Sequence, residues 1–503
     1  MRNERHSRTK LIFNTLAITL IVISFHKNTY ASNSNSIKPI KTISSPLPDQ
    51  HIYTELQSIN KGKLLFFDAH RINLSGLTLL SLLADLGIRE HPKLTRHELS
   101  NMEATDKALS LELYYIASQS QGNQLSSVAN NPADFKAAIK NDTLPAYIDS
   151  AMPQFNAVIR LRQAINKYRH IKDIDWPPLT DTFNPRLGQA HREVRILRHK
   201  LVTLNDLKTG STSKHRLNIF DQSIMNGIKH FQRRHGLKPS GKLDIHTTDA
   251  LNQSIATRIN KLQVNLWRWL SLPRTPPSKY IMVNIPGFDL MLVDKGKSVL
   301  KMKVIVGKPS NQTPVMITEV NSVTLNPTWT PTRNIINNEL LPLHSKNSTA
   351  LKNLNFHLAK GYGANTVYQE IPVNLQDMLG QYRLVQRAGN NNALGKVRFN
   401  IKNNNAIFLH DTPTKHLFNR YNRALSHGCI RLQEPNNLLT SLLINHDNNK
   451  SETTHVRLAR TLPVFITYQT TWVDHLGRIN FRNDLYKKDA HNTQYTLSKP
   501  TKN

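Results

Sequence analysis

The spacing of hydrophobic residues divides the chain into a helical part and a strand-rich part. Between residues 56 and 270, apolar side chains recur every three or four positions, which is the period of amphipathic helices. From residue 279 the pattern changes to short apolar runs separated by Pro/Gly turns, as in Tyr280–Ile285, Asp289–Asp294 and Val299–Val306. The pattern therefore predicts helical domains followed by a β-rich domain.

Residues 56–190 are predicted to form a helical scaffold domain without catalytic residues. His97-Glu98 begins like a zinc-protease motif, but Asn101 stands where that motif needs its second histidine. Because no other chemical constellation occurs in this stretch, we interpret it as scaffold.

Residues 191–255 are predicted to form a small domain of three short helices. Asp221 would cap the second helix at its start, Gly236 would end it, and Arg234 would lie on the surface. A connecting helix is expected within residues 256–277, because apolar residues there keep the helical period.

The small helical domain resembles the peptidoglycan-binding domain family. The resemblance rests on Phe231–Leu237 (FQRRHGL), Gly241, Asp244, Thr247 and Leu251. The family usually has an acidic residue before the turn glycine, where this chain has Ser240. The alternative interpretation is a three-helix spacer that binds no ligand.

Residues 1–31 have the layout of a secretory signal peptide. Basic residues at positions 2, 5, 8 and 10 precede the apolar run Leu11–Phe25, and Thr29–Ala31 offers small residues for cleavage. The run is shorter than the ~20 residues that span a bilayer, and an uncleaved N-terminal anchor is the alternative. We therefore expect an exported, periplasmic protein, with a Ser/Asn/Pro-rich linker over residues 32–55.

The charge balance favours an anionic partner. The 503 residues include 66 Lys and Arg against 34 Asp and Glu, a formal net charge of +32. Export and the lack of helix-turn-helix, RNP or zinc-finger patterns argue against nucleic acid. We expect anionic polymers of the cell envelope instead; the alternative is that the charge only maintains solubility.

The candidate chemistry lies around the single cysteine, Cys429, which excludes an internal disulfide and a Cys-rich metal site. It belongs to the run Ser426–Arg431 (SHGCIR), which follows His410 at the end of a predicted strand. A thiol with a pKa of ~8.5 needs a base or a positive field to act as a nucleophile at neutral pH. His410 can supply that base and can later protonate a leaving amine.

The residues around the thiol extend this interpretation to acyl transfer. Gly428 allows close backbone approach, so the N–H groups of Gly428 and Cys429 could hold a tetrahedral oxyanion, and Arg431 could bind a substrate carboxylate. One alternative is an inert buried cysteine beside a structural histidine. Another is a metal site of His410, His427 and Cys429, although the usual ligand spacings of zinc are absent.

The spacing from His410, across fifteen residues, to Ser426–Arg431 resembles the signature of the L,D-transpeptidase (YkuD) catalytic domain. With the helical regions upstream, the whole chain resembles the large YcbB-like transpeptidases. The other matching segments are Val306–Pro309, Thr313-Pro314, Asn326–Trp329, Pro331, Asn392–Gly395 and Tyr468–Tyr486. Two departures are Phe408, where the family commonly has Tyr, and Ala388–Asn391, which replaces a proline-rich glycine loop.

The resemblance implies a multidomain α+β fold. Its catalytic domain would be a mixed, β-sandwich-like structure over residues 278–489, followed by a tail over 490–503. The polar and irregular sequence of residues 333–380 is long enough for a lid, and we assign the lid insertion to residues 333–395.

The resemblance also implies a reaction. Cys429 would attack the third, diamino acid residue of a peptidoglycan tetrapeptide stem, D-alanine would leave, and an acceptor amine would resolve the thioester into a 3-3 cross-link. His410 would be the base, and Ser426 would hydrogen-bond near it. The implied substrate contacts are Gly428, Ser426, His427 and Arg431, with a pocket formed by Trp329 and Phe408.

The partners implied are stem peptides and the sacculus, with carbapenem-type inhibitors and without a metal or other cofactor. Because acceptor choice lies in the shape of the pocket, the motif leaves alternatives open. These are a thiol amidase that uses water, a transferase that anchors proteins to the wall, and a catalytically inactive wall-binding protein. No protein partner is predicted.

Overall fold

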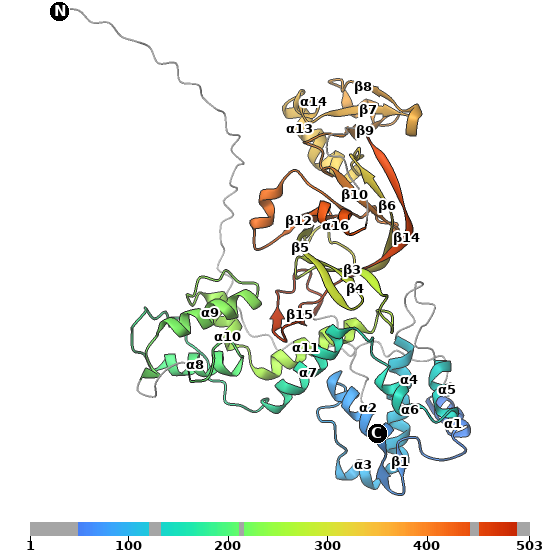
Figure 1. Cartoon of the computed structure of the whole chain (residues 1–503), viewed down its shortest axis with the longest axis vertical. Helices are drawn as coiled ribbons and strands as arrows, with labels where there is room; N and C mark the ends of the chain where they lie inside the picture. Colours follow the sequence, from blue (N-terminus) through green and yellow to red (C-terminus); the bar gives the residue numbers. More distant parts are fainter. Residues whose placement is uncertain (1–48, 120–131, 211–215, 443–451, 490–503) are drawn as a thin grey trace, which may run out of the picture. The chain divides into compact units, whose positions relative to one another are not determined.

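The computed structural model describes most of the chain (Figure 1), namely residues 49–119, 132–210, 216–442 and 452–489. The predicted signal peptide, 1–31, and the predicted tail, 490–503, lie outside the described residues. Among the described residues, every helix is too short or too polar to span a bilayer.

A helical scaffold comes first, as predicted. Its helices and one small hairpin pack around a core that includes Leu56, Leu79, Leu113 and Phe135. The elements are α1 (Asp49–Ile59), β1 (Phe67–Asp68), β2 (Arg71–Ile72), α2 (Leu74–Asp85), α3 (Arg96–Ser100), α4 (Met102–Gln119), α5 (Pro132–Lys140), α6 (Leu144–Asp149) and α7 (Asn156–His170).

The start of α1 corrects one predicted boundary. The linker was expected to extend over residues 32–55, but α1 begins at Asp49. Ile52 and Tyr53 are buried, and the Tyr53 hydroxyl donates a hydrogen bond to Asp106 at 3.1 Å. The linker prediction is wrong for residues 49–55 because their apolar side chains already belong to the scaffold core.

The small helical domain has the predicted three helices, α8 (Glu193–Thr203), α9 (Gln222–Arg234) and α10 (Ile245–Asn252). The Asp221 carboxylate accepts a hydrogen bond from the Ile224 amide at 3.0 Å, so it caps α9 as predicted. Gly236 follows the helix with φ at +67°, in the left-handed region that favours glycine. The connecting helix is α11 (Ile255–Trp269).

Arg234 is buried, which contradicts the prediction that it lies on the surface. Its Nε donates to the Asp206 carboxylate at 2.7 Å, and its Nη1 donates to the Ile479 carbonyl at 3.0 Å. The carbonyl of Arg234 in turn accepts a hydrogen bond from Arg482 at 2.9 Å. The prediction is wrong because strand β16 (Ile479–Phe481), which covers this side chain, lies 245 residues away in sequence.

The strand-rich domain is built on one mixed, nine-stranded sheet in the order β12-β5-β13-β11-β10-β6-β14-β3-β4. Strand β5 also pairs with β4 at the far end of this order, so the sheet closes on itself. Most pairs are antiparallel, whereas β11–β13, β12–β5 and β14–β3 are parallel. The strands are β3 (Lys279–Asn284), β4 (Asp289–Asp294), β5 (Lys297–Gly307), β6 (Met316–Leu325), β10 (Val397–Ile401), β11 (Phe408–His410), β12 (Ala424–Ser426), β13 (Ile430–Leu432) and β14 (Thr454–Thr467).

The insertion between β6 and β10 is an ordered unit with a hydrophobic core of its own. Leu351, Phe356, Leu358 and Leu384 are buried in that core. The prediction that residues 333–380 are irregular is therefore wrong. Its elements are α12 (Arg333–Ile335), a π-helix (Ile336–Leu340), α13 (Leu341–Lys346), α14 (Ala350–Asn353), β7 (Phe356–Lys360), a 3-10 turn (Gly363–Asn365), β8 (Val367–Gln369), α15 (Leu375–Met378) and β9 (Arg383–Gln386).

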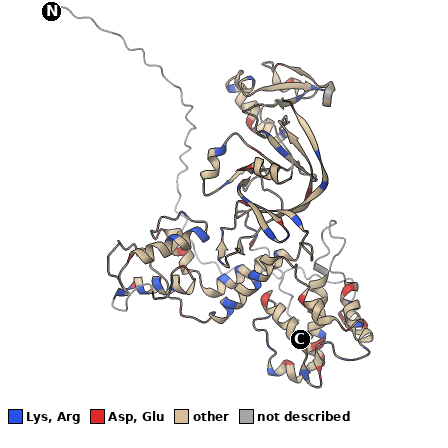
Figure 2. Cartoon of the chain, in the orientation of Figure 1, with Lys and Arg blue, Asp and Glu red and all other residues tan. Residues whose placement is uncertain are grey.

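The remaining elements are a 3-10 helix (Lys415–Asn419), α16 (Pro435–Ser441), β15 (Thr471–Val473) and β16. Figure 2 shows lysines and arginines distributed over the helical regions and the β-sheet domain alike. The predicted fold class, with a helical scaffold, a small helical domain and a mixed β-rich catalytic domain that carries an insertion, is confirmed.

Candidate active site

His410 occupies a buried position at the end of β11, and 4% of its surface is exposed. Its Nδ1 lies 2.5 Å from the carbonyl oxygen of Asp411. Because a carbonyl oxygen can only accept a hydrogen bond, Nδ1 must carry the proton. The neutral imidazole therefore presents the lone pair of Nε2 as a base.

Three charged or titratable side chains form a row across neighbouring strands. In the strand register, Arg398 of β10 pairs with His410 of β11, and His410 pairs with Arg431 of β13. Directly paired residues share one face of a sheet. Burial, the positive charge of Arg431 and that of Arg398 lower the pKa of His410 to about 3, so His410 is neutral at neutral pH.

Cys429 lies immediately before β13 and is half-buried. The register places it level with Phe408, two residues from His410, and side chains two apart in a strand project to the same face. The thiol lies 3.6 Å from the carbonyl oxygen of Ala406. The geometry thus brings the predicted nucleophile and the predicted base to one face of the sheet.

The pKa of the Cys429 thiol is raised, chiefly by burial. A backbone hydrogen bond from Phe408 and the positive charges of Arg431 and Arg398 oppose this shift, because each stabilises the thiolate. The resting site therefore contains a neutral thiol and a neutral imidazole, next to cations that favour the thiolate once it forms.

Arg398 is a site residue that the sequence analysis missed. Its guanidinium carbon lies 4.8 Å from the centre of the Phe408 ring, and burial lowers its pKa. The signal was present in the strand sequence VRFNI, where Val397, Phe399 and Ile401 are buried in the core and Arg398 alternates with them. That alternation places Arg398 on the face that carries the thiol.

Ser426 organises the loop that presents the thiol. Its hydroxyl donates to the Cys429 carbonyl at 2.6 Å and accepts from the Gly428 amide at 3.1 Å. Thr313 holds the same loop by donating to the Gly428 carbonyl at 2.7 Å. The expectation that Ser426 hydrogen-bonds near His410 stays a prediction, because both of these bonds lie inside the thiol loop and neither involves His410.

The same bonds narrow the choice of oxyanion donor. Gly428 has φ at +115°, a conformation that favours glycine, and its amide is directed at Ser426. An amide that already donates to a hydroxyl is not aimed at a substrate oxygen. We therefore retain the Cys429 amide, rather than that of Gly428, as the candidate oxyanion donor.

His427 connects the thiol loop to the insertion. Its Nε2 lies 2.6 Å from the Glu339 carboxylate, which belongs to the π-helix of the insertion. Glu339 is a second residue that the sequence analysis missed, because its contact joins segments 88 residues apart. The contact places the insertion over the Ser426–Arg431 loop.

Phe408 and Trp329, the two residues predicted to form a substrate pocket, contact different neighbours. Phe408 lies beside Cys429, as described above. Trp329 instead pairs with Gln386 through two backbone hydrogen bonds of 2.9 and 2.8 Å, and its ring lies 5.9 Å from that of Phe356. Trp329 thus packs on the core of the insertion.

The described part of the chain contains no group of three or more His, Cys, Asp or Glu side chains arranged to hold a metal ion. The combination of His410, His427 and Cys429 accordingly does not form such a group. The site offers a nucleophile, a base, cations and backbone donors, which together can perform acyl transfer.

Comparisons with known proteins agree with this chemistry. Residues 278–446 match the L,D-transpeptidase catalytic domain family (YkuD), and residues 190–251 match a family of domains proposed to bind peptidoglycan. A Haemophilus influenzae protein, whose name proposes an L,D-transpeptidase, is 34% identical over 218 residues. The aligned part covers 42% of this chain and spans 44% of the relative's length.

Solved structures of two L,D-transpeptidases were also found. The one from Stackebrandtia nassauensis is 14% identical, with a TM-score of 0.23 over 57% of this chain and 97% of that chain. The one from Mycobacterium smegmatis is 12% identical, with a TM-score of 0.21 over 38% and 60%. Likeness at these TM-scores does not establish a common fold. By these family matches, residues 278–446 form a domain of the L,D-transpeptidase catalytic family, and residues 190–251 form one of the family proposed to bind peptidoglycan.

Proposed function

We propose that the protein is a peptidoglycan L,D-transpeptidase that forms 3-3 cross-links. The donor is a tetrapeptide stem whose third residue is a diamino acid, and the acceptor is a side-chain amine of another stem. The observation that carries the proposal is the row Arg398–His410–Arg431 next to Cys429, inside a domain of this enzyme class.

In the first half-reaction, His410 Nε2 takes the thiol proton as Cys429 Sγ attacks the carbonyl carbon of the third residue. The tetrahedral oxyanion accepts a hydrogen bond from the Cys429 amide. When the intermediate collapses, the bond to the D-alanine nitrogen breaks. His410 gives its proton to that nitrogen, so D-alanine leaves as a neutral amine and a thioester remains.

In the second half-reaction, the acceptor amine attacks the thioester carbonyl and passes a proton to His410. The carbon–sulfur bond breaks, and the proton returns to the sulfur. One amide bond has replaced another, so the exchange needs no external energy source.

The pKa directions indicate when the proton moves. Burial raises the pKa of the thiol and lowers that of the imidazole, which disfavours a preformed thiolate–imidazolium pair. Proton transfer therefore accompanies the attack on the carbonyl, and Arg398 and Arg431 stabilise the negative charge as it develops. The same arginines suit the free carboxylates of a stem peptide, because guanidinium groups bind carboxylates through paired hydrogen bonds.

The cellular setting is part of the proposal. Residues 1–31 would direct export, and the reaction would take place on the sacculus in the periplasm. The domain over residues 190–251 would hold the enzyme on its polymeric substrate.

Mass spectrometry of muropeptides after incubation of the purified enzyme with sacculi tests the proposal. We expect new 3-3 cross-linked dimers with wild-type enzyme and none with Cys429→Ala. Trimmed tripeptides without dimers would instead indicate a thiol amidase, and protein-linked stems would indicate a wall-anchoring transferase. Unchanged muropeptides in the presence of sacculus binding would show a catalytically inactive wall-binding protein.

A further inference from the structure

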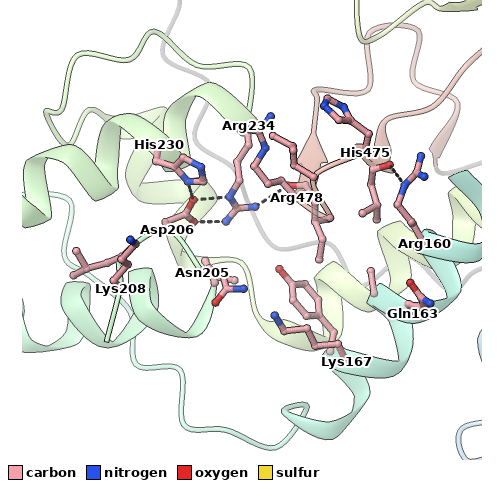
Figure 3. A pocket seen from close by; sticks show the side chains of 18 of the residues that line it. Arg160, Gln163, Lys167, Asn205, Asp206, Lys208, His230, Arg234, His475 and Arg478 are labelled. Atoms are coloured by element: carbon pink, nitrogen blue, oxygen red, sulfur yellow. Dashed lines mark hydrogen bonds and ion pairs between the residues drawn. The ribbon is translucent and has the colours of Figure 1, made fainter. Parts of the chain in front are cut away.

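A second cavity lies outside the site described above. It has a volume of about 840 Å³ and is formed by α7, the loop after α8, helix α9 and the β15–β16 hairpin (Figure 3). Cys429, His410 and the other residues of the catalytic site do not line it. A volume of this size fits a ligand of several residues.

The lining of this cavity is strongly basic. Its charged side chains include Arg160, Lys167, Lys208, Arg234 and Arg478, against the single acid Asp206. Asp206 is already engaged, because it forms a salt bridge with Arg234 and contacts His230 Nδ1 at 2.6 Å.

In the described part of the chain, the two lysines that line the cavity are not paired with a carboxylate. Arg160 donates to the Val473 carbonyl at 3.3 Å, and Arg478 forms a salt bridge with Asp474 at 2.8 Å. By contrast, Lys167 and Lys208 are exposed, and neither forms a salt bridge with a carboxylate in the described part of the chain. The cavity therefore presents an excess of positive charge to a ligand.

Part of the cavity wall consists of buried side chains that are held by hydrogen bonds. The side chains of Asp206 and Arg234 are 0% and 6% exposed, and Arg234 also bonds the Ile479 carbonyl at 3.0 Å. Tyr168, which is 2% exposed, lines the same wall. These contacts join the peptidoglycan-binding domain to the β15–β16 hairpin of the catalytic domain, as Figure 3 shows for the labelled side chains.

We propose that this cavity binds the free carboxylates of a peptidoglycan stem peptide, as a site separate from the catalytic one. A tetrapeptide stem ends in a carboxylate, so it offers a negative charge that can pair with the two lysines. The peptidoglycan-binding and catalytic domains both contribute walls, which favours a stem over an unrelated anion. The inference rests on the proposed function, because it takes the same polymer as ligand.

Photo-crosslinking of the full chain tests this site separately from the catalytic one. The probe is a disaccharide tetrapeptide that carries a diazirine, applied to Cys429→Ala protein and mapped by peptide mass spectrometry. We expect crosslinks both in residues 160–168 and 204–209 and in residues 398–431. Adding Lys167→Glu and Lys208→Glu should raise the half-saturating probe concentration for the first group about tenfold. The second group should not change.

The matched control reverses two exposed lysines of the small helical domain that do not line the cavity, Lys238→Glu and Lys242→Glu. The inference is overturned if the control has an equal effect, if a probe with amidated carboxylates labels the cavity equally, or if the cavity is never labelled. It is also overturned if inorganic phosphate displaces the probe at the probe's own concentration, because the site would then be a general anion site. If residues 398–431 are labelled and the cavity is not, only the second site is disproved. If the cavity is labelled and residues 398–431 are not, the proposed function is disproved.

Discussion

Two clusters of buried charged side chains in this protein differ in whether their charges are paired. In the catalytic sheet, Arg398 and Arg431 flank His410, and within the described residues neither arginine forms a salt bridge. In the small helical domain, Asp206 is bonded to both Arg234 and His230. In the first, catalytic cluster the nearby carboxylate of Glu339 forms no salt bridge with Arg431, whereas in the second, complete cluster Asp206 is bonded to Arg234.

The difference separates a reactive site from a structural one. Buried cations without a counter-ion cost free energy because they lose hydration. In the proposed reaction, a thiolate and a substrate carboxylate would supply the missing negative charge next to Arg398 and Arg431. The complete cluster joins two domains instead, so its removal should affect stability rather than chemistry.

The largest expected effect comes from Cys429→Ala, which removes the nucleophile. A β-lactam carbonyl is a strained version of the stem amide, so a carbapenem should acylate wild-type enzyme once per chain. Intact-mass spectrometry should show one adduct on Cys429 and none on the variant. An adduct on Ser426 would contradict the assignment of the nucleophile.

The next largest effect is expected for His410→Ala, which should slow acylation by about 10²–10⁴-fold, the range of a positioned acid–base group. Because the pKa of His410 is about 3, the wild-type rate should stay flat from about pH 4 to about pH 8. Below that range His410 gains a proton and ceases to act as a base. The variant should instead become faster as pH rises, because its thiol must lose its proton to solvent. A wild-type inflection near pH 6.5 would show that His410 is not buried as described.

The complete cluster should respond through stability. Asp206→Asn leaves Arg234 buried without its carboxylate, and breaking a buried pair costs about 3–5 kcal/mol. Thermal unfolding should therefore shift downward, while carbapenem acylation of the folded protein stays near the wild-type rate. Glu370→Gln, which breaks the exposed pair with Lys352, is the matched control and should shift unfolding little. Equal shifts for the two variants would show that the cluster does not hold the domains together.

The smallest of these effects is expected for Arg398→Gln. Removing one of the two cations near Cys429 should raise the pKa of the thiol further and slow its alkylation by iodoacetamide about tenfold. Arg333→Gln, on an exposed arginine of the insertion, serves as the control. Unchanged alkylation in Arg398→Gln would remove Arg398 from the site.

Local signals in the sequence predicted much of the fold. The short apolar run within Asp289–Asp294 marked β4 to the residue, and Asp221 and Gly236 marked the two ends of α9. These signals depend on neighbours within one element, so one sequence is enough to find them. The spacing between His410 and Cys429 predicted the nucleophile and base for a different reason, its likeness to a known family.

What the sequence did not predict depends on contacts between distant segments. Arg398 meets His410 only through the register of β10 and β11, and Glu339 meets His427 across 88 residues. Arg234 looks like a surface residue until β16 covers it. The insertion looked irregular because its elements are only a few residues long and show no sustained helix or strand period, although Leu351 and Phe356 belong to a small core of its own.

The independent core of the insertion has a consequence for how this enzyme class could diversify. Because residues 335–384 fold around their own apolar side chains, the segment can be exchanged without rebuilding the sheet beneath it. The two segments that connect the insertion to the sheet lie side by side, because Trp329 pairs with Gln386. A chimera that carries another enzyme's insertion would therefore keep the sheet that holds Cys429 and His410, and would change the contact that Glu339 makes with His427.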